Sequence, residues 1–346
     1  MRACKKNMIH FKVLLFFEQA KLDKFDVEEC SMRFLIYGAG ALGQAIGCML
    51  ATDGHEVDLV LRERFKEVLD TSGLKVTGIF GDYEVAPGTL NLVTNLSCLD
   101  GSPYEYVLIT TKAYDTEGAV KDISNLPRFN GIVVSMQNGC GNVEQVEAVF
   151  GPDRSLGARV ITGFEIERPG IVRITVSADD VHVGGCQPGK IPETAVRFAE
   201  ALHGAGLPCC AVGDIYKDLF AKLLYNCALN PLGAILGVHY GALSDSVDCR
   251  DIMDRVIEET FKVIDAMGFA THWQGAEVYK EVFYSKLVPI TYDHRPSMLQ
   301  DIEHEKPTEV EALIGYVAAQ GKMRGVATPT CDVLAALVRF KEKQPR

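Results

Sequence analysis

The hydrophobic positions of this chain form their first regular pattern after Met32. Phe34 to Tyr37 is a short apolar run typical of a buried parallel strand, and three glycines follow it in the spacing G-x-G-x-x-G. A helical pattern comes next, and then a second apolar run from Val57 to Leu61. This order predicts a βαβ unit that binds a dinucleotide, because such glycines permit a tight turn, close approach of a pyrophosphate and helix packing. The predicted cofactor contacts in the turn are Gly38, Ala39, Gly40, Ala41, Leu42 and Gly43.

The alternation of apolar strands and helical patterns continues beyond this unit. Tyr106 to Thr111 and Gly131 to Met136 have the composition of two further buried strands. Shorter β-rich runs follow at Ile171 to Val176 and Val181 to Gly184, with a turn at Pro169-Gly170 before the first of them. These runs predict an antiparallel extension of the sheet.

Strand signals vanish after Gly213, and long helical patterns continue to the C-terminus. We therefore expect an α/β Rossmann-type N-terminal domain over residues 32–213 and an all-α C-terminal domain over residues 214–346. Residues 1–31 precede the first predicted strand and are interpreted as an appendage. Their apolar patch, Val13 to Phe17, is too short for a secretory signal and is followed by charged residues rather than a small-residue cleavage site.

Composition and charge narrow the class of protein. With 346 residues, 47% of them hydrophobic and 23% charged, the chain resembles an ordinary enzyme of about two domains. Its net charge of −11 argues against nucleic acid or an anionic membrane as the main partner. Eleven cysteines without a C-x-x-C pair are typical of reduced thiols in a cytosol, and no apolar run approaches the roughly 18 residues of a membrane span. We expect a cytoplasmic protein without a bound metal.

Arg62 lies at the end of the second predicted strand, where the side chain selects between the two nicotinamide dinucleotides. A carboxylate there would bind the ribose 2′-hydroxyl of NAD, whereas an arginine suits the 2′-phosphate of NADP. Arg62 therefore favours NADP. The alternative is that Arg62 and Arg64 are solvated charges at the start of a helix.

Lys112 and Asn138 each follow a predicted parallel strand. Ligands of open α/β sheets bind beyond the carboxyl ends of the strands, so both side chains are candidates to contact cofactor or substrate. Because Asn-Gly is a favoured turn dipeptide, Asn138-Gly139 is equally well explained as a plain turn.

Lys222, Asn226 and Asn230 are spaced four residues apart in a pattern that is otherwise apolar and helical. At 3.6 residues per turn they lie within an arc of roughly 80° on one face. Such a polar row requires either a polar site or internal hydrogen-bond partners, and both interpretations stay open. Pro231 follows directly and should kink or end the helix, because it lacks the amide that would bond to the carbonyl of Cys227.

Two later segments have the spacing of capping boxes: Ser297 with Gln300, and Thr308 with Glu311. The simplest interpretation is two helix starts. A helix N-terminus also attracts anions, so Ser297 is in addition a candidate to bind a carboxylate.

The motifs GAGALG, TKAY, QNGCG, KLLYNCALNP, SMLQD and PTEVE occur in an order and spacing that resembles the ketopantoate reductase (2-dehydropantoate 2-reductase) family. The resemblance covers nearly everything from Met32 to Lys341. It implies a Rossmann domain joined to an all-α domain of the 6-phosphogluconate-dehydrogenase type, an active site in the cleft between them, and hydride transfer from NADPH to a small 2-oxo acid. A homodimer is one possible assembly.

The resemblance also implies roles for individual residues. Lys222 matches the general acid that protonates the developing alkoxide, and Asn226, Asn230 and Ser297 match residues that hold the hydroxyl and carboxylate of the substrate. Asn138 matches a contact shared by nicotinamide and substrate. The implied cofactor contacts outside the glycine turn also include Lys112, Gly163 in the turn Ile161-Thr162-Gly163, and Glu309. Glu309 lies near the catalytic lysine and is the second residue to which the resemblance gives a catalytic role.

The chain departs from the family pattern near the substrate end. Close relatives have T-E-I-D with an asparagine soon after, whereas here Thr308-Glu309-Val310-Glu311 is followed by Ala312-Leu313, and the usual arginine just before is replaced by Glu305-Lys306. The substrate could therefore be a different branched or hydroxylated 2-oxo acid. A protein that senses NADP(H) without turnover is a further alternative, although it would have no use for an acid at Lys222.

Overall fold

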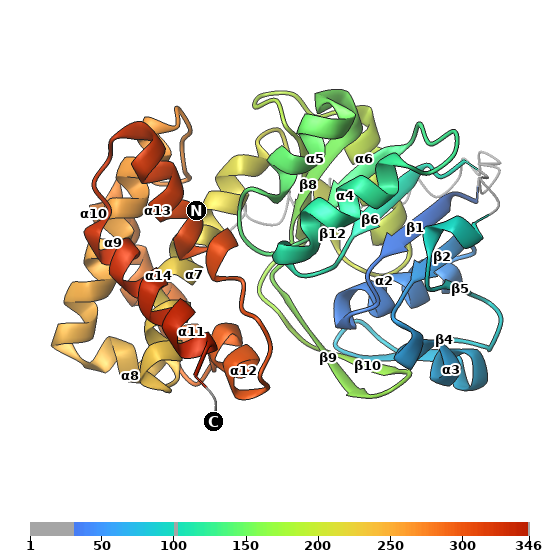
Figure 1. Ribbon diagram of the computed structural model, residues 1–346, viewed down its shortest axis with the longest axis horizontal. Coiled ribbons are helices and arrows are strands. Elements are labelled where there is room, and N and C mark those ends of the chain that lie inside the picture. The colour runs from blue at the N-terminus through green and yellow to red at the C-terminus, as the bar shows by residue number, and fades with distance from the viewer. Residues whose placement is uncertain (1–30, 100–102, 345–346) are drawn as a thin grey trace, which may run out of the picture. The chain divides into compact units, whose positions relative to one another are not determined.

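The computed structural model describes residues 31–99 and 103–344, so the predicted appendage, apart from Ser31, lies outside the described residues. Arg33–Arg346 packs as one compact unit that contains both domains. In Figure 1 the α/β elements and the helices after β12 gather on opposite sides of this unit.

An eight-stranded sheet forms the centre of the N-terminal domain, in the order β12-β11-β8-β7-β6-β1-β2-β5. The strands are β1 (Arg33–Tyr37), β2 (Glu56–Val60), β5 (Asn91–Val93), β6 (Tyr106–Ile109), β7 (Ile132–Ser135), β8 (Ser155–Arg159), β11 (Val181–Gly185) and β12 (Cys209–Ala211). Neighbours from β5 to β8 pair in parallel, and β11 pairs with β8 antiparallel. The predicted strands at Phe34, Val57, Tyr106 and Gly131 are confirmed, with ends shifted by one or two residues.

The order of strands reverses beside β1, since the chain runs from β1 to β2 on one side and later returns to β6 on the other. In open α/β sheets such a switch point opens a crevice at the carboxyl ends of the strands. The helices of this domain are α2 (Ala41–Thr52), α3 (Glu63–Ser72), α4 (Thr116–Ser124), α5 (Asn142–Phe150) and α6 (Glu193–Gly204), with short 3-10 turns η1 (Leu96–Cys98), η2 (Ala113–Asp115) and η3 (Pro152–Arg154).

The predicted extension of the sheet is correct only for the run at Val181, which forms β11. The hairpin around Pro169-Gly170 pairs elsewhere, in a second sheet of order β4-β3-β10-β9. This sheet contains β3 (Leu74–Gly78), β4 (Tyr83–Val85), β9 (Thr162–Arg168) and β10 (Ile171–Ser177), and all four strands contact α2. A local turn signal predicts a hairpin but not its partner, which here is β3, almost a hundred residues earlier in the chain.

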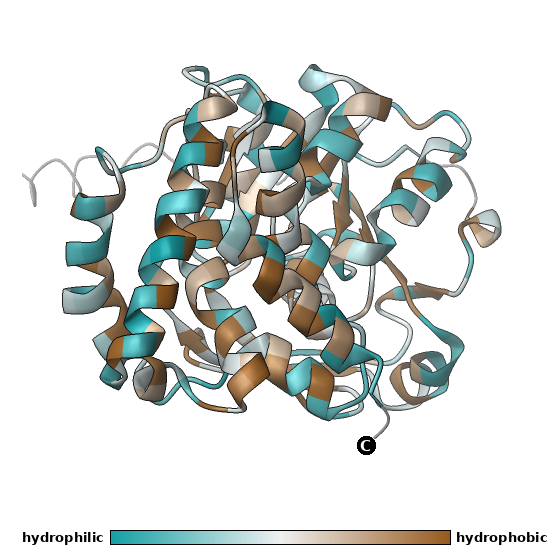
Figure 2. Cartoon of the chain, turned by 60° about the vertical axis from the view of Figure 1, so that its left-hand side comes forward, coloured by the Kyte–Doolittle hydropathy of each residue, from teal (hydrophilic) through white to brown (hydrophobic). Residues whose placement is uncertain are grey.

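The C-terminal domain is helical throughout its described residues, as predicted. It comprises α7 (Ile215–Leu236), α8 (Tyr240–Asp245), α9 (Val247–Ala266), α10 (Ala276–Val282), the π-helical turn η4 (Phe283–Leu287), α11 (Val288–Ile290), α12 (Ser297–Glu303), η5 (Val310–Ala312), α13 (Ile314–Arg324) and α14 (Pro329–Glu342). The outer helices carry both hydrophilic and hydrophobic residues along their length, as expected for helices that pack one face on a core (Figure 2).

α7 is the central helix of this domain and contacts α8, α9, α12 and α14. By length and composition alone it could span a membrane, but 67% of its most apolar stretch is buried inside the protein. Of the two outcomes expected at Pro231, a kink or an end of the helix, the end is wrong, because α7 continues to Leu236 and ends at Gly237 in the left-handed conformation. Burial of most of this helix supplies packing that offsets one missing backbone hydrogen bond.

Candidate active site

The glycine turn after β1 has the backbone geometry that its spacing predicts. Gly38 has a φ of +124°, and a Cβ atom on Gly43 would lie 1.9 Å from the carbonyl oxygen of Gly38. In contrast, a Cβ on Gly40, which precedes α2, would meet no described atom within 4 Å. The packing of the turn therefore requires glycine at positions 38 and 43. At Gly40 the backbone is open, and a pyrophosphate would approach the N-terminus of α2 there.

Arg62 lies beyond the carboxyl end of β2, directly before α3, and is exposed. β2 lies next to β1 in the sheet, and β1 leads into the glycine turn. This position suits a 2′-phosphate, and equally a solvated charge. Its role stays a prediction.

Lys222 connects α7 with the ends of two parallel strands of the N-terminal domain. Its Nζ atom lies 2.5 Å from Oδ1 of Asn138, which follows β7, and 2.5 Å from the carbonyl oxygen of Val160, which follows β8. Gly139, with a φ of +82°, forms the turn that its dipeptide predicts. Asn138-Gly139 is therefore a turn whose asparagine side chain also contacts Lys222.

Glu309 is buried in the segment between α12 and η5 and reaches the same region from the C-terminal domain. Its carboxylate accepts hydrogen bonds from the backbone amide of Ala113 at 3.1 Å and from Nδ2 of Asn138 at 3.3 Å. Nζ of Lys112 lies 3.5 Å from Glu309 and 2.8 Å from Asp301. The structure therefore brings together four predicted residues, Lys112, Asn138, Lys222 and Glu309.

The two lysines of this cluster have opposite pKa shifts. Burial lowers the pKa of Lys222 to about 8, and nearby Glu309 opposes the fall without cancelling it. Burial also acts to lower the pKa of Lys112, but the carboxylates of Glu309 and Asp301 outweigh it and raise this pKa above its usual value. Lys112 is thus a permanent cation that ties the domains, whereas Lys222 can exchange its proton near neutral pH.

Asn226, Asn230 and Ser297 form a chain of hydrogen bonds beside Lys222. Nδ2 of Asn230 donates to Asn226 at 3.2 Å, and the Ser297 hydroxyl donates to Oδ1 of Asn230 at 3.3 Å. Both asparagines are buried. The polar row of α7 thus has internal partners, and it also lines up polar atoms along the helix that carries Lys222.

Both segments begin helices as predicted, α12 at Ser297 and η5 at Val310, but neither forms the reciprocal bonds of a capping box. Ser297 is the first residue of α12, one position inside the helix, because Pro296 occupies the capping position, and the serine hydroxyl bonds to Asn230 instead. The amide of Thr308 donates to Glu342 at 2.7 Å, while Glu311 binds Arg339 at 2.6 Å. The Thr308 hydroxyl still accepts a local bond from the amide of Val310 at 3.2 Å, whereas distant side chains take the Ser297 hydroxyl, the Thr308 amide and the Glu311 carboxylate.

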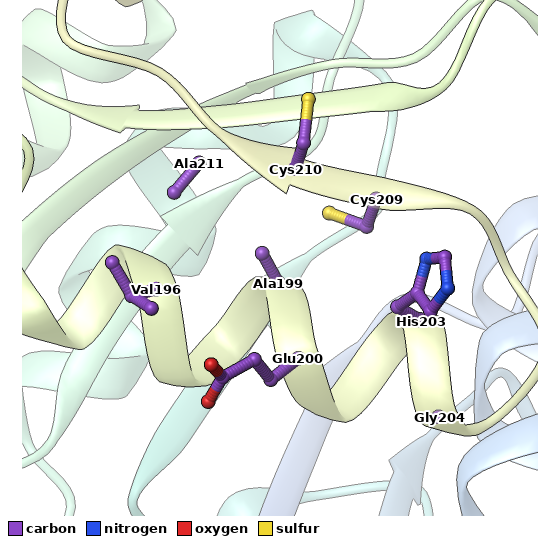
Figure 3. A pocket seen from close by; sticks show the side chains of 8 residues that line it. All are labelled: Val196, Ala199, Glu200, His203, Gly204, Cys209, Cys210 and Ala211. Atoms are coloured by element: carbon purple, nitrogen blue, oxygen red, sulfur yellow. The ribbon is translucent and has the colours of Figure 1, made fainter. Parts of the chain in front are cut away.

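Gly163 is not part of the Lys222 cluster. The expected turn at Ile161-Thr162-Gly163 is wrong from Thr162 onward, since these residues begin β9, and a Cβ on Gly163 would lie 2.6 Å from Thr175 of β10. The hollow in Figure 3, of about 340 Å³, is lined by residues of α6 and β12 and by none of the predicted site residues.

Sequence reasoning missed the carbonyl of Val160 and the carboxylate of Asp301. A backbone carbonyl has no sequence signature, so Val160 could not have been found. Asp301 ends the motif SMLQD and follows Ser297 by one helical turn, which was a usable signal.

Comparisons with known proteins agree over both domains. The family profile described as "Ketopantoate reductase PanE/ApbA" matches residues 34–187, and the profile described as "Ketopantoate reductase PanE/ApbA C terminal" matches residues 214–342. The 2-dehydropantoate 2-reductase of Aquifex aeolicus is 39% identical over 312 residues, which cover 90% of this chain and 97% of that protein.

Two solved structures have the same fold. A PanE/ApbA family ketopantoate reductase from Ralstonia eutropha JMP134 is 27% identical, with a TM-score of 0.78 over 90% of this chain and 98% of that one. D-mandelate dehydrogenase in complex with NADH and anilino(oxo)acetate is 26% identical, with a TM-score of 0.77 over the same shares. Proteins with this fold are thus named for more than one substrate, and one of them was solved with a nicotinamide cofactor.

Proposed function

Because this chain belongs to the ketopantoate reductase PanE/ApbA family, we propose that it reduces 2-dehydropantoate (ketopantoate) to pantoate with NADPH, a step of pantothenate and coenzyme A biosynthesis. At the coarser level the chain is an NAD(P)-dependent oxidoreductase of that family. The observation that carries the proposal is the position of the Lys222 amine, which belongs to the helical domain but lies between Asn138 and the carbonyl of Val160.

Lys222 is the proposed general acid. An ammonium group has three N–H donors, and two of them are directed at Asn138 and Val160, so the third is free to donate to the C2 carbonyl oxygen of a 2-oxo acid. When bound, NADPH supplies a hydride to C2. As negative charge develops on the oxygen, Lys222 stabilises it and transfers its proton, which gives the hydroxyl of pantoate and a neutral amine. The amine regains its proton from solvent, and Glu309 favours the ammonium form.

The remaining predicted residues have binding roles in this proposal. The open backbone at Gly40 would accept the pyrophosphate, and Arg62 the 2′-phosphate that distinguishes NADPH from NADH. Asn226, Asn230 and Ser297 would exchange their mutual hydrogen bonds for bonds to the hydroxyl and carboxylate of the substrate. Lys112 would act near the cofactor through its position after β6.

An alternative substrate is supported by the likeness to D-mandelate dehydrogenase, a protein solved with NADH and anilino(oxo)acetate. The chain also lacks the family arginine near Lys306 and has Glu311 bonded to Arg339. These features favour a second candidate function, the reduction of another branched or aromatic 2-oxo acid. A cytoplasmic location, and a homodimer as one possible assembly, complete the proposal.

The test is steady-state oxidation of NADPH and NADH by the purified full chain. We expect 2-dehydropantoate with NADPH to give the highest kcat/KM in a panel that also contains 2-oxoisovalerate and benzoylformate. A higher kcat/KM for another 2-oxo acid would show that the substrate is that acid and would leave the proposed type of reaction unchanged. Binding of NADPH without turnover of any member would favour the sensor and contradict the proposed function.

A further inference from the structure

A second set of ionisable side chains lies one helical turn before Lys222. We call it the Asp218 cluster, and its members are Arg159, Asp179, His182, Asp218 and His272. Oδ1 of Asp218 lies 3.1 Å from Nδ1 of His182, 3.1 Å from Nε2 of His272 and 3.9 Å from Nε of Arg159. Arg159 also binds Asp179 at 2.8 Å. None of these residues was part of the predicted site.

The Asp218 cluster joins the two domains. Arg159 ends β8 and is paired in register with His182 of β11, while Asp179 lies between β10 and β11. Asp218 belongs to α7, and His272 lies between α9 and α10. The side chains of Arg159 and Asp218 are only 5% and 9% exposed. Charges so deeply buried are costly to leave without a partner. Arg159 and Asp218 pair at an ion-pair distance of 3.9 Å, while the hydrogen bonds of these side chains go to Asp179 and His272.

The Asp218 cluster and the contacts of Lys222 both involve α7 and the end of β8. Asp218 precedes Lys222 by four residues on α7, so the two side chains lie on the same face of that helix. Arg159 precedes Val160, whose carbonyl accepts the Lys222 hydrogen bond. α7 is therefore fixed to the end of β8 at two points, about one helical turn apart.

We propose that Asp218 and Arg159 are positioning residues for Lys222: their contact sets the position of α7 along β8, and thereby holds the amine against Val160 and Asn138. The inference rests on the proposed function, in which Lys222 donates the proton. A shift of about 1 Å in a catalytic group can cost 100-fold in rate, so an anchor at this point has consequences for turnover.

The cluster also acts on Lys222 through charge. The Arg159 guanidinium adds to burial in lowering the pKa of Lys222. Burial acts to raise the pKa of Asp218, but His182 and Arg159 outweigh it and lower this pKa, so Asp218 is an anion that offsets the charge of Arg159. Removal of Arg159 should therefore raise the pKa of Lys222. Removal of Asp218, which takes away the anion that offsets Arg159, should lower it, and loss of packing alone would not separate the two variants in this way.

The test uses Asp218→Asn and Arg159→Met in the full chain, with Glu258→Gln as the control. Glu258 forms an ion pair with Lys280, 2.7 Å apart, at a more exposed position than Asp218, and the structure shows no bond from it to the Asp218 cluster in the part of the chain that it describes. The pKa of Lys222 is measured by competitive labelling with acetic anhydride and mass spectrometry, and kcat and the KM for NADPH are measured with the best 2-oxo acid. The labelling requires no turnover, so it remains informative if the proposed function fails.

We expect Asp218→Asn to lower the pKa of Lys222 and Arg159→Met to raise it, each by about half a pH unit or more. Both variants should lose kcat by about 10-fold or more while the KM for NADPH changes less than about threefold. The control should match the wild type. Unchanged or parallel pKa values, or undiminished kcat, would overturn the proposal. If Arg159→Met does not fold, Arg159→Lys replaces it and should lower kcat while it leaves the pKa of Lys222 nearly unchanged.

Discussion

Replacement of Lys222 by methionine should make the protein more stable and nearly inactive. The methionine fills a similar volume but has no charge to bury. A fall in the lysine pKa from its ordinary value of 10.5 to about 8 means that the folded state disfavours the ammonium form. At about 1.4 kcal/mol per pKa unit, this penalty is at most roughly 3.5 kcal/mol, and loss of the hydrogen bonds to Asn138 and Val160 reduces the net gain.

The pH dependence of this gain has a definite sign. Well below pH 8 the lysine is charged in both the folded and the unfolded state, so the folded wild type bears the whole penalty. As pH rises from about 8 towards 10.5, the folded protein loses the proton first and the penalty disappears. The stability advantage of Lys222→Met should therefore be largest near pH 7 and should vanish near pH 10.5.

Activity should change in the opposite sense. A positioned proton donor contributes typically 10²- to 10⁴-fold, so kcat of Lys222→Met should fall by at least about 100-fold. The Kd of NADPH should stay within a few-fold, because the predicted cofactor contacts lie mainly in the N-terminal domain. In the wild type, kcat should fall as pH rises through about 8, where the acid loses its proton.

The assays are urea unfolding at several pH values, NADPH titration by fluorescence and steady-state turnover. Lys217→Met is the matched control, since Lys217 lies on the same helix with 40% of its side chain exposed and only a 3.8 Å contact to Asp214. It should leave all three measurements near the wild type. Turnover of Lys222→Met within a few-fold of wild type, or loss of NADPH binding together with turnover, would refute the assignment of the proton donor.

Three further changes test other parts of the structure. Arg62→Ala should weaken NADPH binding by roughly 10- to 100-fold in a fluorescence titration and leave NADH nearly unaffected, because a charge-assisted hydrogen bond contributes about 1.5–3 kcal/mol; equal losses for both cofactors would contradict recognition of the phosphate. Ser297→Ala should raise the KM of the 2-oxo acid by about 10-fold with little change in the KM of NADPH, and an unchanged substrate KM would leave Ser297 only its bond to Asn230. Glu259→Gln should destabilise the protein by about 1–3 kcal/mol in urea unfolding without changing KM, because the buried carboxylate accepts two backbone amides at the start of α14; a loss below 0.5 kcal/mol would mean that these bonds are easily replaced.

Local pattern predicted the parts of the fold that local forces determine. The strand from Phe34 to Tyr37, its glycine turn and α2 follow from apolar periodicity and from the steric needs of Gly38 and Gly43. The partner of the β9–β10 hairpin was not predictable in this way, because pairing with β3 depends on tertiary packing over α2. The sequence therefore determines which segments are strands more directly than which strands are neighbours.

The candidate site divides in the same manner. The polar row of α7 could be identified because its residues share one helix and one spacing. The bond between Lys112 and Asp301 joins residues 189 positions apart, and no periodicity within either segment connects them. The helix starts predicted at Ser297 and Thr308 are correct, but the reciprocal bond from the Thr308 amide to Glu311 is absent for a related reason. The Thr308 amide donates to Glu342 and the Glu311 carboxylate binds Arg339, both on α14 and far along the chain.

The uninterrupted course of α7 through Pro231 has a consequence for the site. Asp218, Lys222, Asn226 and Asn230 recur every four residues, so each is rotated by about 40° from the one before, and the row winds slowly around the helix. Its first member meets Arg159 of the N-terminal domain, its second meets Val160, and its last meets Ser297 of α12. A helix that ended at Asn230 would leave that residue at a fraying terminus, where its side chain could not hold a fixed position. Continuation to Leu236 places Asn230 a turn and a half inside the helix, so that the proposed substrate contacts and the proposed acid are held by one rigid element.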